Sequence, residues 1–174
     1  AWQGEEPTRE GYTFAGWTPV FAETVDESVT YTALWKANDY IVTFDANGGD
    51  DLSGFTKRVT YDSAYGALMT PSREGHTFAG WYDENGELVT SSTIYKFTKN
   101  TMLTAHWTIN TFDVIFVDEN GETVDTITVD WNTVLTDEDY PEVPAKEGYT
   151  GAWNVVTDPI TEDTTIEAVY TINT

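Results

Sequence analysis

The residues Pro71-Ser72-Arg73-Glu74-Gly75-His76-Thr77-Phe78-Ala79-Gly80-Trp81 form a motif that the chain contains in three versions. An earlier copy spans residues 7–17, and a shortened later copy spans residues 144–153. In each copy a proline stands four residues before a glycine, and the run ends at a tryptophan. A glycine that accepts a positive φ, followed by an alternating run, predicts a turn that starts a β-strand. We therefore expect three copies of one small β unit.

The repeat divides the 174 residues into three units. Residues 38–110 form a complete unit, residues 111–174 form a divergent complete unit, and residues 1–37 hold only the back half of a unit. A unit of about 65 to 70 residues lies near the lower size limit for an independent core. We expect the incomplete first unit to pack on the middle unit or to pair with another chain, unless its boundary is artificial.

Two junctions between units have the same length, because Trp35 and Phe44 are separated by the same nine positions as Trp107 and Phe116. Short junctions of constant length leave little slack. We therefore expect neighbouring units to repeat one relative orientation, as in a semi-rigid rod.

Period-two patterns place the strands. The strands expected in the middle unit are residues 40–44, 56–61, 77–82 and 101–107, and those in the third unit are 112–117, 123–131, 149–155 and 165–170. The first unit retains a strand after Gly11, an acidic connection over 23–28 and a strand over 29–35. Residues 62–70 are expected to hold one helical turn. The predicted fold class is mainly β, and α+β at most.

Charge limits the possible partners. The chain has 30 acidic and 8 basic residues and a net charge of -22, which repels nucleic acids and anionic membrane surfaces. Residues 111–174 carry fifteen acids and one base, and the expected role of this charge is a solvated surface. There is no cysteine for a disulfide or thiolate site. Residues 1–4 lack the features of a signal peptide, so any export or anchoring signal is expected outside this fragment.

Three motifs occur in a fixed order: Val42-Thr43-Phe44-Asp45-Ala46-Asn47-Gly48-Gly49, then Gly75-His76-Thr77-Phe78-Ala79-Gly80-Trp81-Tyr82, then Leu103-Thr104-Ala105-His106-Trp107. Together they resemble the Listeria-Bacteroides repeat, the family of the internalin B-type B repeats. The resemblance implies β-grasp-like units, each a four-stranded twisted sheet with a short crossing element, arranged in tandem in bacterial surface proteins. It implies no catalytic residues. The third copy departs from the pattern, with Gly151-Ala152-Trp153 and a closing Tyr170.

Aromatic residues recur at equivalent positions and are interpreted as core anchors, because large rings supply much burial from few residues. The anchors are Trp17, Trp81, Trp153, Phe44, Phe116, Trp35, Trp107 and Tyr170. The alternative interpretation is a ladder of tryptophans that stacks on sugar rings. Tyr82 and Trp131 are expected to be more exposed, so any ligand contact is predicted there.

The Asp-x-Asn rhythm at residues 45–47, 83–85 and 118–120 is of a kind that calcium ligands use, but no copy completes a calcium loop. Asn-Gly is already accounted for by a tight turn. His76 and His106 are isolated and predict no metal site. We expect no metal and no cofactor.

No nucleophile elbow, P-loop or dinucleotide motif is present, so no enzyme activity is expected. A chance pair of acids of the glycosidase type stays open on counting alone, although small β units offer little depth for a site. An isopeptide cross-link at Lys57, Lys96 or Lys99 has no supporting motif.

The leading hypothesis is a non-catalytic stalk or adhesive spacer in an exported bacterial cell-surface protein, located outside the cell. The alternative is a binding module that recognises a glycan or a host-surface protein through exposed aromatics or a sheet edge. This segment is expected to contact neither nucleic acid nor membrane.

Overall fold

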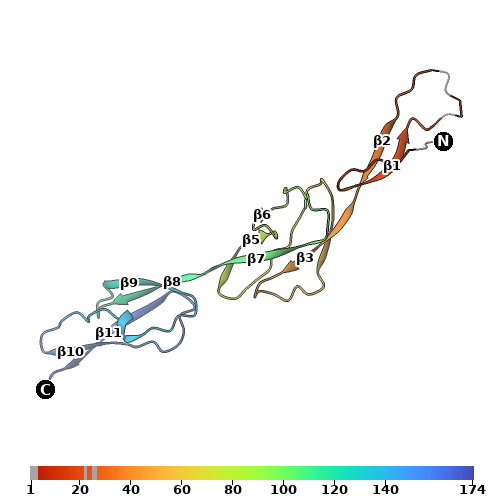
Figure 1. The fold of residues 1–174 in the computed structure, drawn as a ribbon. Coiled ribbons are helices and arrows are strands. Elements are labelled where there is room, and N and C mark those ends of the chain that lie inside the picture. Colours follow the sequence, from red (N-terminus) through yellow and green to blue (C-terminus); the bar gives the residue numbers. More distant parts are fainter. Residues whose placement is uncertain (1–3, 22, 25–26) are drawn as a thin grey trace. The chain divides into compact units, whose positions relative to one another are not determined.

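The computed structural model describes residues 4–21, 23–24 and 27–174, and its described part is mainly β with no α-helix (Figure 1). The elements are β1 (Tyr12–Thr18), β2 (Thr32–Ala37), β3 (Asp39–Asp45), β4 (Thr56–Thr60), β5 (His76–Tyr82), β6 (Leu88–Val89), β7 (Thr101–Ile109), β8 (Thr111–Val117), β9 (Thr123–Asp130), the 3-10 helix η1 (Asp137–Asp139), β10 (Tyr149–Trp153) and β11 (Thr164–Ile172). The mainly β prediction is confirmed. Residues 1–3 and part of the expected acidic connection, Val25 and Asp26, lie outside the described residues.

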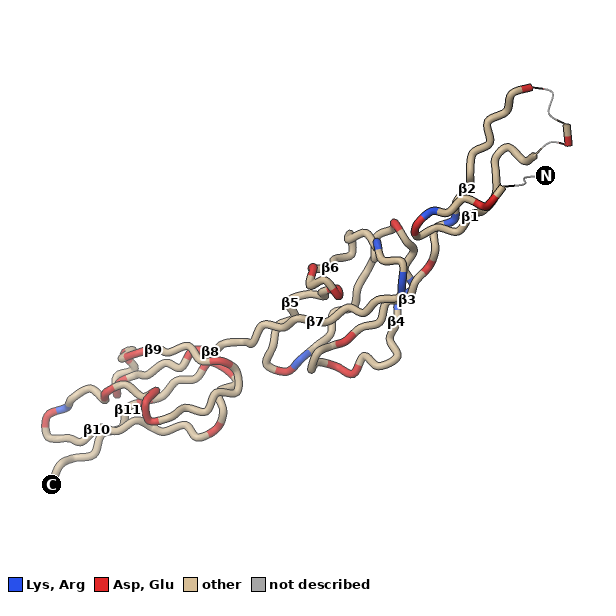
Figure 2. The backbone as a smooth tube through the Cα atoms, in the orientation of Figure 1, with Lys and Arg blue, Asp and Glu red and all other residues tan. Residues whose placement is uncertain are grey.

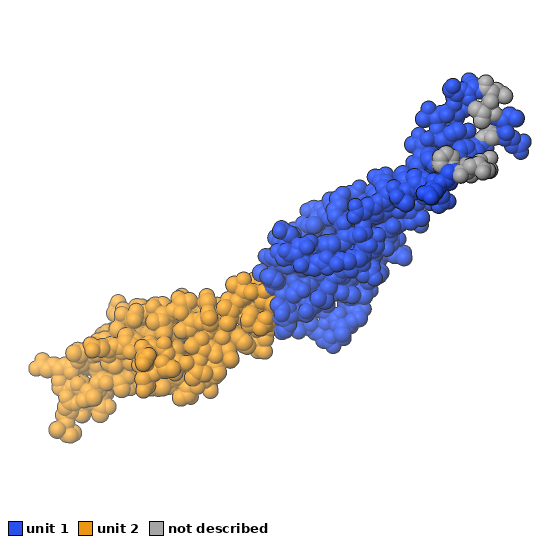
Figure 3. All heavy atoms as spheres, viewed as in Figure 1, with its two compact units in different colours: residues 1–71, 78–106 blue, residues 72–77, 107–174 orange. Residues whose placement is uncertain are grey.

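The chain divides into two compact units, coloured separately in Figure 3. The first contains residues 1–71 and 78–106, and the second contains residues 72–77 and 107–174. The turn before β5 and the first two residues of that strand therefore group with the third repeat. Each unit is described by itself below.

The middle repeat forms a five-stranded sheet in the order β4-β3-β7-β5-β6. Strand β3 lies antiparallel to β4 and parallel to β7, so the first and last long strands of the repeat are neighbours. Burial alternates along β3, with Val42 and Phe44 facing the core, as the period-two pattern predicts. The resemblance implied four strands, and the fifth is the two-residue β6.

The third repeat forms a four-stranded sheet in the order β10-β11-β8-β9. Strand β8 lies antiparallel to β9 and parallel to β11, which is the arrangement of β3 with β4 and β7 in the middle repeat. Its core consists of Val114, Phe116, Leu135, Trp153, Ile160, Ile166 and Ala168. The divergent sequence of this repeat therefore retains a core of its own.

The first repeat is an antiparallel pair, β1 and β2, with a bulge between Phe14 and Gly16. In the third repeat, β10 and β11 pair without a bulge, and Gly151 opposes Tyr170 where Phe14 opposes Trp35. The third copy is one residue shorter than the first because it lacks the bulged residue. The shortened motif thus keeps the tryptophan in register.

The predicted helical turn over residues 62–70 is wrong. The segment is irregular, and its backbone N–H groups donate across to another irregular segment, Tyr65 to the Thr93 carbonyl at 2.9 Å and Gly66 to the Ser91 carbonyl at 2.9 Å. Burial of Tyr65 and these long-range bonds compete with the local i to i−4 bonds of a helix. The helix of the described chain, η1, instead follows Thr136.

Candidate functional site: the aromatic joints

The residues that connect the first repeat to the middle one form a first aromatic joint, consisting of Gly11, Tyr12, Thr13, Asn38 and Tyr61. Gly11 is buried beneath the ring of Tyr61, and a Cβ at Gly11 would stand 2.3 Å from Cδ1 of that ring. Its φ is +74°, a conformation that disfavours side chains. Glycine is therefore required here both for its backbone angle and for the space above it.

Hydrogen bonds fix the backbone of the first joint. The N–H of Asn38 donates to the Gly11 carbonyl at 2.9 Å, and the N–H of Tyr61 donates to the Asn38 carbonyl at 2.8 Å. The Thr13 hydroxyl donates to Oδ1 of Asn38 at 2.5 Å. Asn38 thus ties the turn at Gly11 to the residue that covers it.

Polar contacts surround the first joint. The Tyr12 hydroxyl donates to the Asp62 carboxylate at 2.9 Å, and Lys96 also donates to that carboxylate. The bonds from Lys96 and Tyr12 lower the pKa of Asp62 from its ordinary value. The guanidinium of Arg9 lies 3.9 Å from the centre of the Tyr12 ring, a cation-π distance. The incomplete first repeat therefore contacts the middle repeat through specific side chains.

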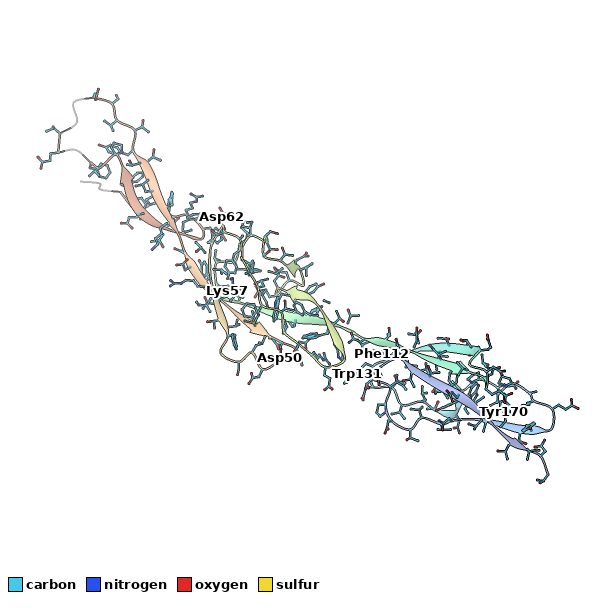
Figure 4. The ribbon with its side chains drawn as sticks, turned by 180° about the vertical axis from the view of Figure 1, so that it is seen from behind. Asp50, Lys57, Asp62, Phe112, Trp131 and Tyr170 are labelled. Atoms are coloured by element: carbon cyan, nitrogen blue, oxygen red, sulfur yellow. The ribbon has the colours of Figure 1, made fainter. Side chains whose placement is uncertain are left out.

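The same arrangement recurs in a second aromatic joint, consisting of Gly75, His76, Thr77, Asn110 and Trp131. A Cβ at Gly75, whose φ is +67°, would stand 1.9 Å from Cδ2 of Trp131. The N–H of Asn110 donates to the Gly75 carbonyl at 2.9 Å, and the N–H of Trp131 donates to the Asn110 carbonyl at 2.7 Å. The Thr77 hydroxyl donates to Oδ1 of Asn110 at 2.7 Å. Figure 4 labels Trp131, which follows β9.

The proposed core anchors fall into two groups. Phe44, Trp81, Phe116 and Trp153 are buried. Trp17, Trp35, Trp107 and Tyr170 are half-buried.

Trp81 of the middle repeat and Trp153 of the third repeat have matching surroundings. Nε1 of Trp81 donates to the Met69 carbonyl at 2.7 Å, and Nε1 of Trp153 donates to the Pro141 carbonyl at 2.6 Å. Each indole also meets a first-strand phenylalanine edge to face, with ring centres 5.0 and 5.2 Å apart. Trp17 packs instead on Phe14 and Phe21, so it anchors a smaller cluster.

The two aromatics predicted to contact a ligand lie in different settings, and both are half-buried. Trp131 covers Gly75 in the second joint. Tyr82 stacks on His106, with ring centres 4.0 Å apart and an angle of 21° between the planes. Tyr82 belongs to the first compact unit and Trp131 to the second.

The Asp-x-Asn rhythm belongs to turns. Oδ1 of Asp118 accepts the N–H groups of Asn120 at 2.8 Å and Glu122 at 2.9 Å, and Asp83 accepts the corresponding pair from Asn85 and Glu87. These bonds to backbone N–H groups lower the pKa of Asp118. The described residues contain no cluster of three or more metal-ligating side chains. Figure 2 shows acidic residues spread along the backbone around β8, β9 and β11.

The three lysines considered for cross-links each have a polar partner. Lys57 donates to the Ala67 carbonyl at 2.8 Å, Lys96 pairs with Asp62, and Lys99 lies 2.9 Å from the Glu84 carboxylate. These partners are a carbonyl and two carboxylates, so the contacts are ordinary hydrogen bonds and ion pairs.

Two open depressions mark the surface of the first compact unit. One, of about 290 Å³, is lined by the turn over residues 44–53, and the other, of about 370 Å³, is lined in part by Phe78, Trp81 and Leu88. Both are wide-mouthed, and the lining of the first includes Asp51, whose carboxylate accepts the Ser53 N–H at 2.9 Å.

Sequence reasoning identified the motif around Gly75 but missed its partner, the aromatic residue after the returning strand. A signal was available. Asn38 and Asn110 each follow a closing strand, and an aromatic residue stands 23 positions after the first and 21 positions after the second, at Tyr61 and Trp131. The pairing of these positions with Gly11 and Gly75 depends on the fold.

A chain of small mainly β units, connected through repeated glycine–aromatic contacts, defines a tandem-repeat protein. A sequence model of the Listeria-Bacteroides repeat domain matches residues 3–34 and 40–108. This match covers more than half of the chain, so the chain belongs to the Listeria-Bacteroides repeat family, as the resemblance predicted. The matched ranges do not include the third repeat.

Similar proteins extend the comparison. A protein of Evansella cellulosilytica named "Putative membrane protein" is 32% identical over 97% of this chain and 28% of its own length. A second protein of that organism, named "Putative Gly-rich membrane protein", is 32% identical over 95% of this chain and 21% of its own length. Internalin H of Listeria monocytogenes is 38% identical over 44% of this chain and 15% of its own length. The chain thus spans less than a third of each relative. Within the part that the structure describes, no helix is long and apolar enough to cross a membrane.

Proposed function

We propose that this chain is a non-catalytic stalk or adhesive spacer in an exported bacterial surface protein, where it lies outside the cell. The observation that carries the proposal is the repetition of one aromatic joint, with the same glycine, asparagine and threonine contacts, between successive repeats. A spacer has to keep its two ends at a set separation, and a repeated joint with the same hydrogen bonds is suited to that task. Membership of the repeat family and the similarity to Internalin H support it.

The joints explain how such a spacer would resist bending. In each joint an aromatic ring packs on a glycine. One asparagine donates its N–H to the glycine carbonyl, and its own carbonyl accepts the N–H of the aromatic residue. Bending at the joint would lift the ring from the glycine and break the hydrogen bonds to the glycine and asparagine carbonyls, so the apolar contact and the net stabilisation by these bonds would be lost. The net charge of -22 favours a solvated chain.

Small-angle X-ray scattering tests this function. The chain is expected to give an elongated particle at physiological salt, and Gly75→Ala is expected to broaden its distance distribution. Gly121→Ala is the control, because Gly121 also has a positive φ but no neighbour within 4 Å of an added Cβ. A compact globule for the unaltered chain would contradict the proposal.

A second candidate function is glycan binding, and the stack of Tyr82 on His106 favours it. The stack holds the phenol ring in a fixed plane, and sugars bind to aromatic faces. We therefore infer that Tyr82 would be the first contact of any glycan. On a glycan array, Tyr82→Ala is expected to abolish binding, whereas Phe55→Ala, which removes an exposed aromatic ring elsewhere on the chain, is expected to preserve it. Equal binding by both variants would reject Tyr82 as the site.

We also propose that the two complete repeats are β-grasp variants. Each places its first and last long strands side by side in parallel at the centre of a mixed sheet. The connection between the hairpin and the third strand is irregular in both, with η1 as a short helical piece in the third repeat. An experimental structure with a different strand order would reject this assignment.

A further inference from the structure

The third repeat contains the glycine side of an aromatic joint. The N–H of Asn173 donates to the Gly148 carbonyl at 2.9 Å, and the Thr150 hydroxyl donates to Oδ1 of Asn173 at 2.7 Å. The equivalent bonds in the first joint run from Asn38 to Gly11 and from Thr13 to Asn38. The geometry that receives an aromatic ring is therefore present a third time.

The local sequence supports this equivalence. The tetrapeptide Thr171-Ile172-Asn173-Thr174 is identical to Thr108-Ile109-Asn110-Thr111, which contains the asparagine of the second joint. Gly148 has a φ of +79°, close to the +74° of Gly11. The N–H of Tyr149 donates to the Lys146 carbonyl at 3.1 Å, as that of Tyr12 donates to the Arg9 carbonyl at 3.1 Å.

The third position differs in what covers its glycine. Gly11 is buried under Tyr61 and Gly75 is half-buried under Trp131, whereas Gly148 is exposed and a Cβ there would meet no described atom within 4 Å. Tyr149, which follows Gly148, is 37% exposed. An apolar ring placed on Gly148 would also meet Tyr149, just as Tyr61 meets Tyr12 with ring centres 5.5 Å apart.

We propose that Gly148, Tyr149, Thr150 and Asn173 form a docking site for the front hairpin of another repeat unit of this family. The occupant is the tryptophan or tyrosine that follows the returning strand of that hairpin. Its ring covers Gly148, and its backbone N–H donates to the Asn173 carbonyl, as Trp131 donates to Asn110. The proposal deepens the stalk function and rests on its premise that repeats are joined end to end.

A second copy of this same chain does not fit the site as well as a further repeat does. The two residues of the required kind, Tyr61 and Trp131, already cover Gly11 and Gly75. If Tyr61 or Trp131 packed on Gly148 of another chain, the glycine that it covers now would become exposed. Its hydrogen bond to the Asn38 or Asn110 carbonyl would also be lost. The occupant is therefore a repeat in which the aromatic residue after the returning strand of the hairpin does not already cover a glycine.

An extended chain tests the site. A second copy of residues 112–174 is attached after Thr174, so that Asn173 takes the place that Asn110 has before Phe112. In the NMR spectrum, the Hα protons of Gly148 are expected to shift upfield by the ring current of the appended Trp131, toward the positions of the Gly75 Hα protons. Exchange of the Asn173 amide proton is expected to slow at least tenfold relative to the unextended chain.

Two variants of the extended chain provide matched comparisons. The appended ring is also expected to shift the signals of the neighbouring Tyr149. Gly148→Ala is expected to abolish this shift and the slowed exchange, while Gly121→Ala, with φ +81° and equally open surroundings, is expected to keep both. If Gly148→Ala fails to fold, Trp131→Ala in the appended copy provides the same comparison without altering the glycine. Unshifted Gly148 protons in a folded extended chain would overturn the docking site and leave the stalk function standing. A compact scattering profile of the unextended chain would reject the stalk function, even where the Gly148 protons shift.

Discussion

The indole ring of Trp131 lies directly over Gly75, so close that a Cβ on the glycine would be 1.9 Å from Cδ2 of the ring. No rearrangement of a Cβ relieves such a contact, because the Cβ is fixed by the backbone. Gly11 stands in the same relation to Tyr61, at 2.3 Å. The glycine and its aromatic partner therefore act as one structural element, which leads to the first prediction.

Gly75→Ala is expected to lower the free energy of unfolding of the third repeat by about 2–4 kcal/mol, since a forced positive φ and an overpacked contact both add cost. Gly121→Ala has only the backbone cost and is expected to lower it by about 1 kcal/mol. Urea unfolding followed by tryptophan fluorescence measures both. Equal effects of the two substitutions would show that the ring moves aside without cost.

Trp81→Ala is expected to lower the free energy of unfolding of the middle repeat by about 3–5 kcal/mol, because a buried indole leaves a large cavity. Trp17→Ala, at a half-buried position in the two-stranded sheet, is expected to cost about 1–2 kcal/mol. Trp81→Phe retains a ring but leaves the Met69 carbonyl without its N–H donor, so an intermediate loss is expected. Chemical denaturation of the three variants gives the order, and an equal loss for Trp17 and Trp81 would contradict it.

Tyr65→Phe is expected to leave the free energy of unfolding unchanged or to raise it by about 1 kcal/mol. The Tyr65 hydroxyl is buried and has no hydrogen-bond partner among the described residues, so its removal relieves a desolvated polar group. Tyr95→Phe is the matched control, since the Tyr95 hydroxyl donates to the Lys99 carbonyl, and a loss of about 1 kcal/mol is expected. Thermal unfolding of both variants checks the difference in sign.

Alkaline pH is expected to destabilise the middle repeat partly through Tyr65. Burial raises the pKa of Tyr65 to about 12, above the ordinary value of 10.0. The contribution of the neutral Tyr65 phenol to the free energy of unfolding is therefore fully present below pH 10 and is lost as the pH rises toward about 12. Tyr65→Phe is expected to flatten the decline of the urea midpoint in that window. An unchanged pH profile would assign the decline to other groups.

Acid is expected to weaken the turn after β8. The N–H groups of Glu122 and Asn120 lower the pKa of the Asp118 carboxyl, so its stabilising effect is present above its unfolded pKa and is lost as the pH falls through the lower folded value. Asp118→Ala is therefore expected to destabilise the third repeat at pH 7 and to differ less from the unaltered chain as the pH falls below about 3.9. The exposed Asp158→Ala serves as the control, and denaturant midpoints across pH measure both. A constant difference between Asp118→Ala and the unaltered chain would contradict the role of the charge.

Local pattern was sufficient for much of the fold. The alternation in residues 40–44 predicted that one face of β3 would be buried, and the Asn-Gly pairs predicted tight turns. In the structure, the Asp83 carboxylate accepts N–H groups two and four residues ahead in such a turn. The helical turn over residues 62–70 failed because Tyr65 and Gly66 form backbone bonds to residues 91–93, which no local pattern indicates. Long-range hydrogen bonds determine the backbone conformation of residues 62–70.

Spacing, turn residues and period-two alternation, which are properties of short stretches, were enough to predict the mainly β class and the repeat family. The folded chain was needed to show that Trp131 covers Gly75, that Tyr61 covers Gly11 and that no described atom covers Gly148. The two members of each pair are more than 45 positions apart in the sequence, and they meet because a returning strand ends beside the turn of the preceding repeat. Such contacts depend on sheet register and joint geometry, which are set by the whole fold and not by neighbouring residues.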